Sequence, residues 1–330
     1  MDNFFNFFGS IFGYVLWGFY LLIPNYGVAI ILFTIVFKLL LFPFSIKQQR
    51  SMAASGKIQV KIQNLQKRYA DDKQRLQIET QKLYEKEGFD PTGGCSTMLL
   101  PFLIMFGIYY TVLNPLSNAL HLSADAISKA LGMMNQIPGY ASVSIGRYSQ
   151  IEIVRNFANL KPYLTMFSGD EIGRLQSFSH GFKFLGLDLL GTPCDAGNIF
   201  GTLFRSNLWI IPALCLVSSV VTQYFSMKMQ PVKQQQGCMT FGFYMMALFS
   251  AWWACTIPAA VGFYWIISNV MSLAQVVVMN TYYSPDKMNA ETEARRIALR
   301  EQQEAAVRPL SLQRQVLLQK KLGGPEKRSK

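Results

Sequence analysis

Residues 234–285 read QQQGCMTFGFYMMALFSAWWACTIPAAVGFYWIISNVMSLAQVVVMNTYYSP, and this stretch contains no Asp, Glu, Lys or Arg. A helix that spans a bilayer needs ~20 mostly apolar residues, so the stretch can form two such helices joined by a tight turn. Pro258 is the expected break, because proline interrupts the interior of a helix. We therefore expect membrane-spanning helices over about 237–256 and 259–283.

Three more apolar runs precede this stretch, at 27–46, 95–113 and 207–225, each with at most one charged residue. Charged residues make up 15% of the chain, well below the ~25% that is usual in soluble proteins. The sequence therefore predicts an all-α integral membrane protein with five transmembrane helices over 26–285, and it argues against a soluble enzyme.

The amino-terminal segment is uncharged and aromatic over residues 3–23, after a single Asp. Such a segment fits a helix lying in the membrane interface about as well as a short span. We expect residues 1–25 to form an amphipathic interfacial helix. It has no basic segment before it, so we do not expect it to be a cleaved signal peptide.

The positive charges of the connecting segments predict the orientation in the membrane. Segment 47–90 has ten Lys and Arg against six acids, and the tail from 284 has eleven against six. Segment 119–206 is nearly balanced, with seven against six. Because basic loops stay in the cytoplasm, we place the amino terminus outside and the carboxyl terminus inside a bacterial inner membrane.

The polar segments have different patterns. Residues 50–88 carry apolar side chains at helical spacing on both sides of Ala70-Asp71-Asp72, which predicts a cytoplasmic helical hairpin. The external segment 119–206 is mixed, and its role is open. Residues 286–330 form a basic cytoplasmic tail, which is either a solvated helix near anionic lipid or a contact for ribosomal RNA.

Lys38 lies at the twelfth position of the run 27–46, where a charge costs at least ~2.5 kcal/mol. The other predicted spans contain no Asp or Glu that could pair with it. Three explanations remain: a water-filled cavity, deprotonation, or an ammonium that reaches the inner surface ~12 Å away along the helix. Intramembrane charges are functional by default, so we favour the cavity.

Several other polar side chains could share this cavity. Each of them could equally be an interhelical hydrogen-bonding group, worth only ~0.6 kcal/mol. Together they predict a hydrophilic, cationic groove that opens to the cytoplasm and attracts acidic groups. The residues are Thr34, Gln223, Ser268, Asn269, Ser272 and Gln275.

Enzymatic and metal-binding patterns are missing from the sequence. The two histidines, His121 and His180, both fall in the external segment, and the five cysteines form no CxxC motif. No glycine-rich phosphate loop is present. We expect no catalytic activity, no cofactor and no metal.

Three blocks carry a resemblance to a known family: ILFTIVFKLLLFPFSIKQQRSM (31–52), YADDKQRLQIETQKLYEKEGFDPTGGC (69–95) and TIPAAVGFYWIISN (256–269). Weaker support comes from 184–193 and 222–229. The sequence resembles the YidC-type membrane protein insertases of the YidC/Oxa family over most of residues 20–285.

The resemblance implies a function: such proteins insert small or nascent membrane proteins into the bilayer, alone or with the Sec translocon, and hydrolyse nothing. The family's groove base matches Lys38, and its threonine one turn earlier matches Thr34. Its groove glutamine matches Gln223, and the aromatic residues that contact its substrates match Tyr264 and Trp265. Hairpin 50–88 matches the family's element that recruits substrates.

This sequence also departs from the family pattern. The family's base is usually Arg, which stays charged, whereas a lysine can lose its proton when it is desolvated. The large periplasmic domain and extra first span of many Gram-negative members are missing, as in Gram-positive-type members.

Two other functions fit some of these features. An anion transporter or channel could use Lys38 as its substrate site, although the internal repeat that is usual in transporters is not visible. A membrane assembly scaffold would need no groove at all. The partners expected for an insertase are nascent membrane proteins, membrane lipids, the Sec translocon and the ribosome, with no specific DNA.

Overall fold

The computed structural model describes residues 2–87, 93–138, 140, 146, 148–195, 197–228 and 238–306. Helices dominate these residues, and their only sheet is a two-stranded hairpin of β1 (Lys183–Phe184) and β2 (Leu187–Asp188). Leu185 and Gly186 both have positive φ, as a tight two-residue hairpin turn requires. The prediction of an all-α membrane protein is confirmed.

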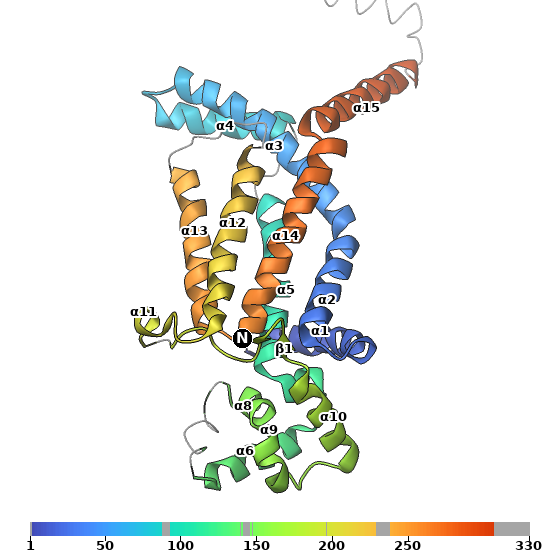
Figure 1. Ribbon diagram of the computed structural model, residues 1–330. Coiled ribbons are helices and arrows are strands. Elements are labelled where there is room, and N and C mark those ends of the chain that lie inside the picture. The colour runs from blue at the N-terminus through green and yellow to red at the C-terminus, as the bar shows by residue number, and fades with distance from the viewer. Residues whose placement is uncertain are drawn as a thin grey trace, which may run out of the picture.

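Five long helices run roughly along one axis (Figure 1). The last of them in the sequence lies at the centre, because it contacts each of the other four. They are α2 (Tyr26–Leu40), α5 (Gly93–Leu113), α12 (Ile210–Lys228), α13 (Cys238–Thr256) and the central α14 (Ala259–Tyr282).

Length and hydropathy alone qualify three helical segments as spans: Phe4–Leu22, Asn207–Lys228 and Ala259–Tyr282. A fourth is the bent pair Tyr26–Leu40 and Phe42–Ser51. The described apolar part of α5, Leu103–Leu113, is shorter. The count of five spans therefore stays a prediction.

The predicted run 27–46 is divided into two helices. α2 ends at Leu40, α3 (Phe42–Arg68) begins two residues later, and the two helix axes differ by 52°. Pro43 explains the break, because it has no N–H to donate to the carbonyl of Leu39 and its ring crowds that carbonyl.

Helix α1 (Asp2–Leu22) lies crosswise to the long helices (Figure 1). It packs closely on α5, since a Cβ atom at Gly9 would lie only 2.9 Å from that of Tyr110. The hydroxyl of Thr111 also donates to the carbonyl oxygen of Gly9, at 2.7 Å. The length and hydropathy of α1 would allow a span, but its crosswise placement favours the expected interfacial position.

One end of the bundle carries α3, α4 (Lys73–Glu87) and α15 (Pro285–Ala306), and we call it the hairpin end (Figure 1). α15 packs on α3, where Arg50 and Glu291 form an ion pair of 3.4 Å. Lys61 bonds Glu87 at 2.7 Å and thereby lowers the pKa of that carboxyl. The predicted tail beyond residue 306 lies outside the described residues.

The opposite end is closed by a helical unit that we call the cap, residues 115–206. Its core is continuous with the start of α2, where the ring of Tyr26 lies 4.4 Å from that of Phe182. Its described helices are η1 (Pro115–Ala119), α6 (Ala124–Gln136), α8 (Ser149–Arg155), α9 (Phe157–Leu160), η2 (Lys161–Tyr163), α10 (Gly169–His180) and α11 (Ile199–Thr202), and η3 (Asn207–Trp209) leads from the cap into α12.

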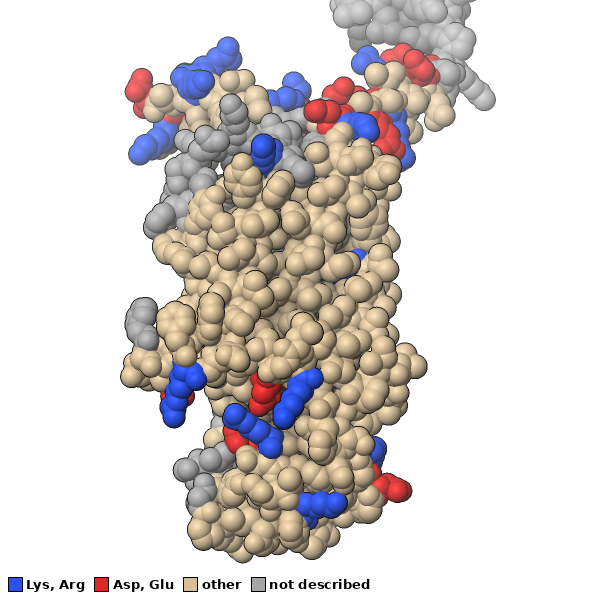
Figure 2. All heavy atoms as spheres, viewed as in Figure 1, with Lys and Arg blue, Asp and Glu red and all other residues tan. Residues whose placement is uncertain are grey.

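Charged side chains gather at two levels of the molecule, at the hairpin end and around the cap (Figure 2). A broad belt made almost entirely of other residues, with one small blue spot in it, separates the two levels on the face shown. This distribution is the one that a membrane-embedded bundle requires, because charges avoid the hydrocarbon core.

Candidate functional site

Lys38 is held at a defined height in the bundle by the anchored start of α2. The Asn25 side chain accepts a hydrogen bond from Val28 N as an N-cap, and it donates to the carbonyl of Lys183 in the cap. The amide of Tyr26 donates to Gly181 of the cap at 2.8 Å. At 1.5 Å per residue, Lys38 lies ~20 Å along the helix from Asn25.

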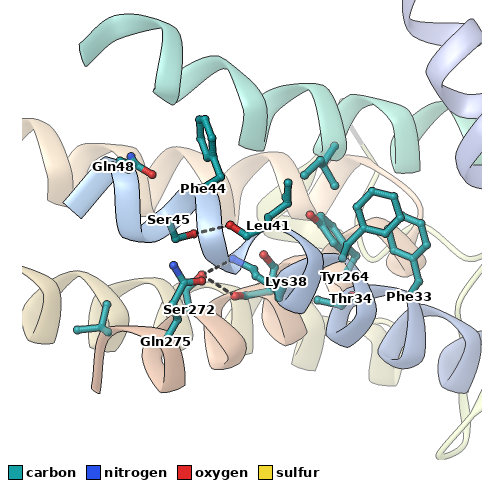
Figure 3. A pocket seen from close by; sticks show the side chains of 14 residues that line it. Phe33, Thr34, Lys38, Leu41, Phe44, Ser45, Gln48, Tyr264, Ser272 and Gln275 are labelled. Carbon is teal, nitrogen blue, oxygen red and sulfur yellow. Dashed lines mark hydrogen bonds between the residues drawn. The ribbon is translucent and has the colours of Figure 1, made fainter. Parts of the chain in front are cut away.

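The ammonium of Lys38 points across the bundle to α14 (Figure 3). It donates to Ser272 Oγ at 2.7 Å, and the Ser272 hydroxyl donates in turn to the carbonyl of Ser268 at 2.8 Å. Among the described residues, no carboxylate forms an ion pair with it. An ammonium has three N–H donors, so two remain for water or an anionic group.

The position of Lys38 in its helix also favours a cation. Lys38 lies in the last turn of α2, where carbonyl groups without helical partners carry partial negative charge. Pro43 removes one of the donors that a continuous helix would supply there. The break in the span therefore offsets part of the cost of the charge.

Two cavities meet at Lys38, and both are also lined by Tyr264, Ser268 and Ser272. The first, about 190 Å³, lies between α2, α3, α5 and α14. The second, about 330 Å³, lies between α5, α12, α13 and α14. Each has room for several water molecules, because one needs only ~10–15 Å³ of such space. We call the two cavities together the groove.

Aromatic rings form the side of the groove that faces the cap. Phe33 is fully buried, and its ring stacks on that of Phe37 at 4.3 Å. Phe12 of α1 packs edge-on against both rings, at 5.5 Å and 5.1 Å. Phe33 and Phe37 thus line the first cavity between Lys38 and the start of α2.

Thr34 lines the first cavity but is 2% exposed, and its hydroxyl donates to the carbonyl of Ile30. Tyr264 lines both cavities and is buried. Trp265 lines the second cavity, where its ring lies 5.6 Å from that of Trp253. The structure therefore brings these three residues to the same hollow as Lys38.

Asn269 lines the second cavity and also joins two helices. Its side-chain amide donates to Ser218 Oγ at 3.0 Å and to Ser219 Oγ at 2.9 Å. The backbone carbonyl of Asn269 accepts from the Thr222 hydroxyl at 3.1 Å. Asn269 therefore both lines the groove and joins α14 to α12, and its predicted role in the groove stays a prediction.

Gln223 lies apart from the other predicted groove residues, because it lines neither of the two cavities. It is partly exposed on α12, one turn beyond Ser219 in the direction of the hairpin end. Its predicted role in the groove stays a prediction.

Some lining residues were not predicted from the sequence. Ser45 and Gln48 continue the helical face of Lys38 and Leu41 through the bend into α3, so their spacing could have identified them. The wall that α13 contributes contains mostly apolar side chains, which sequence alone does not distinguish from core residues. These are Met246, Phe249, Ser250 and Trp253.

The described residues contain no group of three or more His, Cys, Asp or Glu side chains that could hold a metal ion. His121 stacks on Tyr14, and the ring of His180 bonds the carbonyl of Gln176. Both histidines lie at the cap end, far along the chain from Lys38. The groove itself is lined by a cation, hydroxyl groups and aromatic side chains.

Known proteins share this sequence pattern. A protein of Caldanaerobacter subterraneus named membrane protein insertase YidC is 28% identical over 253 residues, which cover 77% of this chain and 84% of that protein. Proteins of the same name from Clostridium tetani and Granulibacter bethesdensis are 45% and 43% identical over 93 and 101 residues. Those matches cover 28% and 31% of this chain, but only 42% and 18% of the relatives.

The model of the family described as 60Kd inner membrane protein matches residues 18–287. That range contains α2 to α5, the cap and α12 to α14, and therefore both cavities of the groove. The chain belongs to the 60Kd inner membrane protein family.

Proposed function

We propose that this protein inserts small or nascent membrane proteins into the bilayer through the groove around Lys38. The relatives' names support this proposal. The observation that carries it is an ammonium whose bonded protein partner is a serine hydroxyl, in a hollow with room for water. Such a site can receive an acidic group temporarily, because no resident carboxylate among the described residues competes for it.

The groove would lower the main barrier to insertion. A client must carry a polar, often acidic, amino-terminal segment across hydrocarbon, where a carboxylate is costly. Water and Lys38 would solvate that segment about halfway across. At 4 Å and an effective dielectric constant of 20, a carboxylate and an ammonium attract each other by ~4 kcal/mol. The attraction is sufficient to favour entry, and weak enough to permit release.

The apolar part of the client would leave sideways into lipid. Exposed apolar side chains surround the hollow on α2 and α13, among them Leu39, Leu40 and Phe249. Burial of apolar surface in lipid supplies the free energy, so no nucleotide is needed. The aromatic layer of Phe12, Phe33 and Phe37 would keep the groove closed towards the cap.

A reconstituted assay tests the proposal directly. Proteoliposomes would receive a single-span client with an acidic amino-terminal segment, and protease protection would report its insertion. We expect Lys38→Arg to retain insertion and Lys38→Glu to lower its rate at least tenfold, since the attraction becomes a repulsion. Unimpaired insertion by the Glu variant would contradict the charge role.

Two controls separate the insertase from the alternatives. With a client whose acidic residues are replaced by neutral ones, Lys38→Glu should have little effect. An anion transporter or channel would instead show Lys38-dependent flux of small anions through the same vesicles without any client. Flux of that kind, together with insertion that is insensitive to position 38, would favour the transport function.

We further propose that the hairpin end faces the cytoplasm and receives clients from ribosomes or the Sec translocon. The basic surplus that could bind ribosomal RNA is not in α15, whose four Lys and Arg are outnumbered by five acids. Residues 307–330 carry seven Lys and Arg and one Glu. Removing 307–330 should therefore lower cosedimentation with ribosomes at low salt. A variant with the same length but neutral residues there is the matched control.

A further inference from the structure

A strap of residues 189–194 crosses the cap end of the central helices. Figure 1 shows the chain between the β1–β2 hairpin and α11 running across the lower ends of α12 to α14. The strap bonds to the turn between α13 and α14, because Ala259 N donates to Gly191 O and Ala260 N to Leu189 O, both at 2.8 Å. It therefore acts as a clamp on that turn.

Two cysteines face each other where the strap ends. The amide of Cys194 donates to the carbonyl of Cys255 at 2.9 Å. With standard covalent geometry, that bond holds the two Cα atoms no more than about 6.8 Å apart, which is the upper limit of the usual range in disulfides. The Cys255 thiol also lies near enough to Cys194 to contribute, after burial, to the raised pKa of the Cys194 thiol.

We propose that Cys194 and Cys255 form a redox-sensitive disulfide site that locks the strap to the cap end of α13. The oxidant is a disulfide, either a small-molecule disulfide or an oxidised thiol–disulfide oxidoreductase. One protein thiolate attacks it and releases one thiol, and the second protein thiolate then displaces the other. Two protein thiols and one oxidant disulfide thus give one protein disulfide and two thiols.

A third cysteine whose side chain is described, Cys215, serves as an internal control. Cys215 of α12 is buried, and its thiol donates to the carbonyl of Gly262 at 3.2 Å. It therefore already has a backbone partner on α14. Cys194 and Cys255 are far apart in the sequence. A disulfide between them would therefore close a long segment of chain and strongly restrict the unfolded state.

The reaction should be slow in the folded protein. Both thiols are buried, with 3% and 7% of their residues exposed. Burial, and then the hydrogen bond to Cys255, raises the pKa of Cys194 to about 12. Because the thiolate is the attacking species, oxidation should accelerate as the pH rises from 7 to 9.

The test uses the purified full-length protein in detergent. It is incubated with oxidised glutathione at pH 7 and 9, denatured, and treated with N-ethylmaleimide. Mass spectrometry then counts the labelled cysteines, and a proteolytic map identifies any linked peptides. We expect labelling to fall from five cysteines to three, with the peptides of Cys194 and Cys255 joined, and the thermal unfolding temperature to rise.

Variants make the result specific. Cys215→Ser should keep the linked peptides, and Cys194→Ser and Cys255→Ser should lose them. The map of the unaltered protein remains decisive even if one of these variants fails to fold. Five labelled cysteines after prolonged incubation at pH 9, or a map that joins Cys255 to Cys215, would overturn the proposal.

Discussion

Helix α14 meets α12 on one side and α2 on the other, and the two contacts are built differently. Towards α12, the donors and acceptors of Asn269, Ser218, Ser219 and Thr222 satisfy one another. Towards α2, one hydrogen bond from Lys38 to Ser272 borders two cavities. The contact with α12 thus has several hydrogen bonds, whereas in the contact with α2 an ammonium with three N–H donors has one protein acceptor among the described residues.

The largest expected effect comes from moving the cation within the groove. Lys38→Ala should lower insertion of acidic clients severalfold, because water alone remains to solvate the client's carboxylates. Adding Gln275→Lys, which places an ammonium on the opposite wall of the first cavity, should restore much of the loss. Protease protection in proteoliposomes measures both variants. If the second substitution rescues nothing, the position of the charge matters more than its presence.

A smaller effect, on stability rather than insertion, is expected on the α12 side. Asn269→Leu removes two interhelical hydrogen bonds, at ~0.6 kcal/mol each, and should destabilise the bundle by about 1–2 kcal/mol. Unfolding in detergent measures this loss, and insertion per folded molecule should change little. Reduced insertion by a variant of unchanged stability would give Asn269 a role in insertion as well as in helix packing.

Ser272→Ala tests the contact between α14 and α2. It removes the protein acceptor of the Lys38 ammonium and leaves the α12 contact intact, so the free energy of unfolding should change by less than in Asn269→Leu. A client carboxylate then has one fewer competitor, and we expect insertion to change by no more than about threefold. A loss as large as that of Lys38→Ala would show that the serine is needed to hold the ammonium in place.

The smallest effect is expected at Gln223. Gln223→Ala changes a side chain that lines neither cavity, so insertion and unfolding should both stay close to those of the unaltered protein. The same two assays measure it, with Ser219→Ala as a matched substitution one turn away that does line the groove. A clear insertion defect at Gln223 alone would extend the functional site towards the hairpin end.

Much of the groove could be predicted because Lys38 is a charged residue within an apolar span, where charges are rare. A lysine among apolar residues is conspicuous in any span, and Thr34, Ser268 and Ser272 follow from helical spacing. The interhelical role of Asn269 could not be predicted, since it lies only three residues from Ser272 and the spacing does not show which helix each of them contacts.

The cap and the break at Leu41 were harder to predict. The core of the cap consists of short helices. Their apolar residues do not repeat over enough turns to show a helical pattern in the sequence, and only the tertiary contacts show which of them pack together. The break depends on Pro43, but a proline near the end of an apolar run permits either a kinked span or two helices. The sequence alone could not decide between them.

The break at Leu41 has a mechanical consequence. α2 is tied to the cap at Asn25 and Tyr26, and it ends two residues after Lys38. Under the proposed function, a movement of the hairpin about this break would leave the depth of the cation set by the cap. In the proposed mechanism, the capture of a client at the surface and the stabilisation of its charge inside would then depend on different elements of the fold.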